Sequence, residues 1–198
     1  MDKDQQYSPS QHSHRMTAGE VIDAHVSHLT TESQKARETI EFEEVSYGDR
    51  SGQKLQIFGA KTLPSDAPIL VYIHGGYWQE LSMELSSFMV TPLFKAGCIV
   101  IPIGYDLAPT VSMTEIVSQV KKAVGYVLHM AKRRESRGVY LCGHSAGGHL
   151  AAMMLAVNWI EEIMVSSSLI KGAMLVSGIY DVRPLVETYI NKPLQMTQ

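Results

Sequence analysis

Hydrophobic residues recur along this chain with two different spacings, one typical of helices and one typical of buried strands. Capping-box sequences at residues 17–20 and 112–115 each open a stretch with apolar residues at helical spacing, which predicts helices running to about residue 39 and about residue 132. The run 67–73 is almost continuously apolar, as expected for a strand that is buried on both faces. The chain therefore combines amphipathic helices with buried strands.

The remaining apolar segments complete the pattern of an α/β protein. Apolar residues on both sides of the turn-rich segment 48–52 predict a β-hairpin. Further strands are predicted at 98–103, 139–142 and 172–177, and further helices at 83–94 and 146–157. A hairpin followed by alternating strands and helices predicts a mostly parallel sheet with an N-terminal antiparallel hairpin.

The composition favours one globular domain. Of the 198 residues, 45% are hydrophobic and 19% are charged, which is typical of soluble proteins. Residues 1–16 are polar and predict a flexible N-terminal arm, whereas no linker divides residues 17–198. A net charge of −3 argues against a nucleic-acid partner, and no apolar stretch reaches the ~18 residues of a membrane span.

The cysteines and histidines give no indication of a metal or a disulfide. Cys98 and Cys142 each lie in an apolar run, which predicts two buried thiols. His25 and His28 are one helical turn apart but lack a further ligand, so we expect a surface pair and no metal site. The polar N-terminus has no apolar signal segment, which indicates the cytosol, with the nucleus open to a chain of this size.

The segment Gly143–Gly147 has the G-x-S-x-G pattern of a nucleophile elbow. An apolar strand precedes it and an alanine-rich helix follows it, as the elbow requires. Small residues are needed on either side of Ser145 because the strand and the helix crowd together there. We predict Ser145 as the nucleophile and the amide of Ala146 as one donor of the oxyanion hole.

A second set of oxyanion donors is expected in the loop after an earlier strand. The sequence His74-Gly75-Gly76-Tyr77-Trp78 occupies that place, and its two glycines allow the backbone to turn its amides toward the serine. The amides of Gly76 and Tyr77 are the predicted donors. The rings of Tyr77 and Trp78 are candidates for an aromatic wall beside the substrate, while Trp78 could equally pack the loop.

The residues that would activate Ser145 are harder to find. An α/β-hydrolase carries its catalytic histidine after its nucleophile, and no histidine follows His149. His144 occupies the variable position of the elbow and is expected to point away from the serine, and His149 is expected to pack on the following helix. Asp181 could be mistaken for the triad acid, but it follows the first strand after the elbow helix, and Asp106 is expected to fix a loop.

Four motifs between residues 74 and 181 carry a family resemblance, which covers nearly the whole chain and includes the segment QYSPS at 6–10. They are HGGYW at 74–78, YDLAP at 105–109, LCGHSAGGHLAAMML at 141–155 and LVSGIYD at 175–181. Together they resemble the kynurenine formamidase (arylformamidase) family of α/β-hydrolases, near the hormone-sensitive-lipase-like esterases. Trp78 distinguishes this loop from the glycine-rich loop of the lipase relatives.

The resemblance implies a serine hydrolase that converts N-formyl-L-kynurenine to L-kynurenine and formate in tryptophan catabolism. It also implies no metal or cofactor, and a homodimer in the cytosol and nucleus. The family's acid and histidine are expected beyond the C-terminus of this chain, with further strands and helices of an α/β-hydrolase fold. Two alternatives stay open: a general carboxylesterase of the hormone-sensitive-lipase-like type, and a catalytically inactive truncated form.

Overall fold

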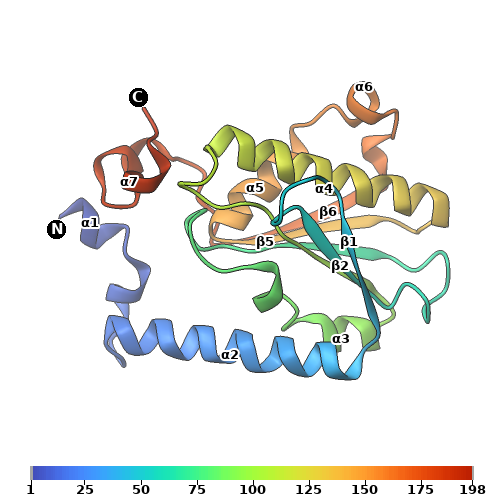
Figure 1. Cartoon of the computed structure of the whole chain (residues 1–198), viewed down its shortest axis with the longest axis horizontal. Coiled ribbons are helices and arrows are strands. Elements are labelled where there is room, and N and C mark those ends of the chain that lie inside the picture. Colours follow the sequence, from blue (N-terminus) through green and yellow to red (C-terminus); the bar gives the residue numbers. More distant parts are fainter. Residues whose placement is uncertain (1, 198) are drawn as a thin grey trace.

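A six-stranded sheet lies at the centre of the computed structural model, which describes residues 2–197 (Figure 1). The order of the strands is β1-β2-β4-β3-β5-β6. They are β1 (Phe42–Ser46), β2 (Lys54–Phe58), β3 (Ile69–Ile73), β4 (Ile99–Ile103), β5 (Val139–His144) and β6 (Ile170–Val176). Both pairings of β2 are antiparallel, and the other pairings are parallel. This confirms the mostly parallel sheet with an N-terminal antiparallel hairpin.

Helices cover the sheet from both sides (Figure 1). One side carries α4 (Met113–Arg134) and α5 (Ala146–Leu155), and the other carries α2 (Ala18–Thr39) and α3 (Val90–Lys95). The shorter helical segments are α1 (Lys3–Gln6), η1 (Pro9–His12), η2 (Met83–Leu85), α6 (Trp159–Ile163), η3 (Ser167–Leu169), η4 (Arg183–Glu187) and α7 (Asn191–Leu194). Among the described residues, none of the helices combines the length and the hydrophobicity that a membrane span requires.

The two long helices begin at the capping residues that the sequence predicts. Thr17 Oγ1 accepts a hydrogen bond from the Glu20 amide, and the Glu20 carboxylate accepts one from the Thr17 amide at 2.8 Å. Ser112 Oγ accepts one from the Glu115 amide at 3.2 Å. Each cap satisfies an amide that has no partner within the helix, which fixes where the helix starts.

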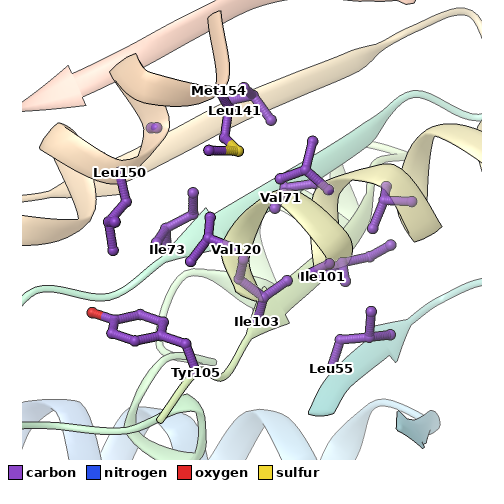
Figure 2. Packing of buried hydrophobic residues seen from close by; sticks show 14 of the residues in the cluster. Leu55, Val71, Ile73, Ile101, Ile103, Tyr105, Val120, Leu141, Leu150 and Met154 are labelled. Carbon is purple, nitrogen blue, oxygen red and sulfur yellow. The ribbon is translucent and has the colours of Figure 1, made fainter. Parts of the chain in front are cut away.

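The main hydrophobic core lies between the sheet and the helices α4 and α5 (Figure 2). Val71 and Ile73 of β3 are fully buried and lie beside Ile101 of β4. Val120 of α4 and Leu150 of α5 close this layer from the helix side. Each fully buried side chain of this size stabilises the fold by about 1.5–3 kcal/mol, so the core holds β3 and β5 firmly in place.

The helix predicted at 83–94 is wrong as one element. The structure has the 3-10 turn η2, then an irregular segment, and then α3. Pro92 has no amide hydrogen, and its ring would clash with the carbonyl of residue 88 in a continuous helix. Ser87 lies in the irregular segment, where its amide donates to Ser33 Oγ at 3.0 Å on α2.

The N-terminal residues differ from an extended tail. They form α1 and η1, and the chain passes beside the C-terminal helix α7 (Figure 1). Lys3 pairs with Glu187, and Asp4 Oδ1 accepts a hydrogen bond from the Tyr189 amide at 2.8 Å. The flexibility of the arm at residues 1–16 stays a prediction, but these contacts give it a defined place in the fold.

Candidate functional site

Ser145 occupies a sharp turn between β5 and α5. Its backbone angles are φ 56° and ψ −119°, a strained combination for a residue that is not glycine. The Ser145 amide donates to the carbonyl of Val176 on β6 at 2.9 Å, and the Ser145 carbonyl accepts from the amides of Gly148 and His149. These bonds hold the turn in the conformation that a nucleophile elbow requires.

Backbone contacts at the elbow leave no room for side chains on either side of Ser145. A Cβ atom at Gly143 would lie 2.1 Å from the carbonyl oxygen of Gly147. A Cβ atom at Gly147 would lie 2.0 Å from the carbonyl oxygen of Ile73, at the end of β3. Both distances are far below any normal contact, so glycine is needed for α5 to start directly behind the serine.

The loop His74–Trp78 lies against the elbow because β3 and β5 are neighbouring parallel strands. Ile73 and Gly143 are partners in this pairing, so both strands end at the same edge of the sheet. A Cβ atom at Gly75 would be 3.1 Å from Ser145 Cβ. The amides of Gly76, Tyr77 and Ala146 have no hydrogen-bond partner among the described residues, and their role as oxyanion donors stays a prediction.

The far half of this loop has an unusual backbone. Gly76, Tyr77 and Trp78 have φ angles of 96°, 47° and 60°, all in the left-handed region. The carbonyl of Gly76 accepts hydrogen bonds from the amides of Gln79 and Glu80, both at 2.9 Å. These two bonds close the turn that follows Gly76.

Trp78 supports the loop from within the core. Its side chain is fully buried and meets His149 edge-on, with 5.3 Å between the ring centroids. Of the two alternatives for Trp78, the structure therefore favours packing, and only Tyr77, which is half-buried, could border a substrate.

His74 positions the start of the loop. Its Nδ1 lies 2.9 Å from the Gly75 carbonyl, and its ring stacks on Tyr105 with 4.3 Å between centroids. The Tyr105 hydroxyl donates to the His74 carbonyl at 2.8 Å. Burial lowers the pKa of His74 to about 4, so the ring is neutral at pH 7. Sequence reasoning missed Tyr105, although an aromatic residue two positions after a buried strand was a usable signal.

The histidines beside Ser145 do not contact its hydroxyl. Within the described residues, no hydrogen bond joins Ser145 Oγ to a histidine nitrogen. The His144 ring faces His25, with 6.1 Å between centroids, and burial together with His25 lowers its pKa. Burial also lowers the pKa of His149, whose ring packs on Trp78.

The carboxylates of Asp181 and Asp106 both have partners other than a histidine. The Asp181 carboxylate makes a two-pronged contact with Arg183, at 2.8 Å to Nε and 2.7 Å to a terminal nitrogen, and these bonds lower its pKa to about 2. Asp106 accepts from the Gly52 amide at 3.1 Å and from Gln119 Nε2 at 3.1 Å. Asp106 therefore fixes the hairpin turn to the loop after β4, as expected.

A cavity of about 580 Å³ opens beside Gly75 and His144, on the side of the sheet that carries α2 and α3. Its lining is largely apolar and includes Tyr72 and Leu93, together with His25. In the described part of the chain, no three histidine, cysteine or acidic side chains come together as metal ligands would. The cavity therefore offers apolar contacts next to the elbow.

Comparisons with known proteins identify related sequences and related folds. The BD-FAE family model covers residues 55–187, which include both the loop and the elbow. A kynurenine formamidase from Salmo salar is 46% identical over an alignment of 202 residues, which covers 100% of this chain and 67% of that protein. A solved structure from Silicibacter sp. is 27% identical with a TM-score of 0.75, and the match covers 100% of this chain and 71% of that one. Esterase B from Lactobacillus rhamnosis, at 22% identity, has a TM-score of 0.63 over 85% of this chain and 59% of its own.

Proposed function

Because the chain belongs to the kynurenine formamidase family of α/β-hydrolases, we propose that it hydrolyses N-formyl-L-kynurenine to L-kynurenine and formate. One observation supports the part of the proposal that concerns a serine nucleophile. Ser145 stands in a strained turn beside the loop of Gly75, and the amides of Ala146, Gly76 and Tyr77 make no hydrogen bond among the described residues. This is the arrangement that acyl transfer to a serine needs.

The proposed reaction has two stages. Ser145 Oγ bonds to the formyl carbon and gives up its proton to a base, while the carbonyl oxygen takes the negative charge and accepts hydrogen bonds from the loop and elbow amides. The bond between carbon and nitrogen then breaks, and the aryl amine leaves with a proton. Water attacks the formyl-serine ester and releases formate and the free serine. Formyl is the smallest acyl group, and it suits the close approach of Gly75 to Ser145.

The test is N-formylkynurenine hydrolysis by the purified 198-residue chain, with Ser145→Ala as the comparison. We expect the variant to lose turnover by at least about a thousand-fold, because it lacks the nucleophile. Turnover that survives in Ser145→Ala would refute the assignment. A folded wild-type chain without turnover would favour the alternative of a non-catalytic form, in which the elbow is present without its base.

A general carboxylesterase is the second candidate. The apolar cavity beside Gly75 and His144 favours it, because such a lining suits the acyl chain of an ester. Comparing kcat/KM for nitrophenyl acetate with kcat/KM for N-formylkynurenine separates the two candidates. A higher value for the formamide supports the first.

The proposal extends to assembly and location. We infer a homodimer in the cytosol, with the nucleus as a second compartment, since the family resemblance implies both. The partner is a small molecule, and neither a nucleic acid nor a membrane is required. Size-exclusion chromatography with light scattering and fractionation of cells test these points, and a monomer or a membrane-bound pool would contradict them.

A further inference from the structure

The N-terminal residues 3–8, called here the N-terminal strap, reach the oxyanion loop. The Tyr77 hydroxyl donates a hydrogen bond to the carbonyl of Tyr7 at 2.8 Å, although the two residues are far apart in the sequence. Tyr77 also supplies one of the free loop amides. The strap thus touches the side chain of a residue that belongs to the oxyanion loop.

The strap is itself attached to the C-terminal part of the fold. Asp4 Oδ1 accepts from the Tyr189 amide at 2.8 Å, and Ser8 Oγ lies 3.1 Å from the Tyr189 hydroxyl. Ser8 is buried and also donates to the Asp4 carbonyl at 2.6 Å. Gln79, two residues after Tyr77, donates to the carbonyl of Ile190 at 2.8 Å. The loop is therefore held by both ends of the described chain, which lie side by side in Figure 1.

The loop needs such support because Tyr77 has a left-handed backbone. Its φ of 47° is costly for a residue with a Cβ atom, and a conformation of this kind persists only when its surroundings fix it. Trp78 is fixed by full burial. The Tyr77 side chain is only half-buried, and its hydroxyl makes its polar contact with the strap.

We propose that the N-terminal strap positions the Tyr77 amide for the oxyanion, with the Tyr77 hydroxyl as the positioning group. This inference rests on the proposed function, since it assigns a task within the same oxyanion hole. A displaced donor stabilises the transition state less while leaving substrate binding nearly unchanged. The strap therefore contributes to kcat rather than to KM.

The first test compares Tyr77→Phe with Tyr47→Phe. Both variants lose a hydroxyl that donates to a backbone carbonyl, since Tyr47 bonds to the carbonyl of Gly104 at 2.7 Å. We expect Tyr77→Phe to lower kcat by about ten-fold with KM changed less than about two-fold, because a misplaced donor should cost part of the 10²–10³-fold effect of a missing one. Tyr47→Phe should change neither. An unchanged kcat in Tyr77→Phe would overturn the proposal.

A double variant asks whether the strap acts as one unit. Ser8→Ala removes the contact with Tyr189, and it should lower kcat in the wild-type background but have no further effect in Tyr77→Phe. If Ser8→Ala and Tyr77→Phe lower kcat additively, Ser8 does not act through Tyr77.

Two more measurements keep this test separate from the identity of the substrate. If the chain cleaves nitrophenyl acetate but not the formamide, the proposed function fails, and the kcat for the ester still tests the strap. Hydrogen exchange at the Gln79 and Glu80 amides needs no substrate at all. Exchange at these amides should be faster in Tyr77→Phe and unchanged in Tyr47→Phe. Equal exchange in the loop of both variants would refute the proposed role of the strap.

Discussion

Replacing Gly147 by alanine adds one methyl group at the tightest point of the elbow. The new Cβ atom would lie 2.0 Å from the carbonyl oxygen of Ile73 and 2.5 Å from that of His74. Both atoms belong to the backbone at the end of the central strand β3, so neither can move away by a change of rotamer. Overpacking costs about 1–3 kcal/mol when side chains can adjust, and we therefore expect a loss of about 3 kcal/mol in the free energy of unfolding. For a domain of this size, that loss corresponds to a fall of about 6–12 °C in Tm.

Gly19→Ala provides the matched control. Gly19 is also the second residue of its helix and also follows an alanine, but a Cβ atom there meets nothing within 4 Å. Alanine should leave stability unchanged or raise it by about 0.5–1 kcal/mol, since it reduces the freedom of the unfolded chain. Thermal unfolding followed by circular dichroism measures both variants. If Gly147→Ala and Gly19→Ala unfold at the same temperature, the crowding argument fails.

Two further predictions concern the oxyanion loop. His74 has a folded pKa of about 4 against an ordinary value of 6.5, so the unfolded chain binds a proton at this site first as the pH falls. The free energy of unfolding should therefore fall as the pH is lowered from 6.5 to about 4, by up to about 3 kcal/mol. Urea unfolding at about pH 7 and about pH 5 measures this loss. The free energy of unfolding of His74→Asn should depend less on pH than that of the wild type. An equal pH dependence would show that His74 is not the group responsible. Trp78→Ala should lower the free energy of unfolding by about 3–5 kcal/mol, because it empties a fully buried site. A loss below about 1 kcal/mol in the free energy of unfolding, measured with urea, would show that Trp78 does not hold the loop in place.

The elements that could be predicted from the sequence are those whose signals are local. The start of α2 follows from the capping residues Thr17 and Glu20, and the burial of β3 follows from its unbroken apolar run. The segment 83–94 also looks helical by its apolar spacing, but Pro92 and the contact of Ser87 with α2 outweigh that local preference. Its structure depends on a partner distant in the sequence, which no periodicity reveals.

The residues of the candidate site likewise fall into those that a local sequence signal identifies and those that it does not. Gly143 and Gly147 identify the elbow because the crowding that demands them acts within a few residues and across one strand pairing. The register that pairs Ile73 with Gly143 then brings the loop after β3 to Ser145, so one local motif and one rule of sheet topology place most of the site. The contact of Tyr77 with Tyr7 follows neither route, because nothing in either residue's neighbours encodes a partner so far along the chain. Under the proposal made above, this contact changes the rate while every motif stays intact, so a search for motifs would not find it.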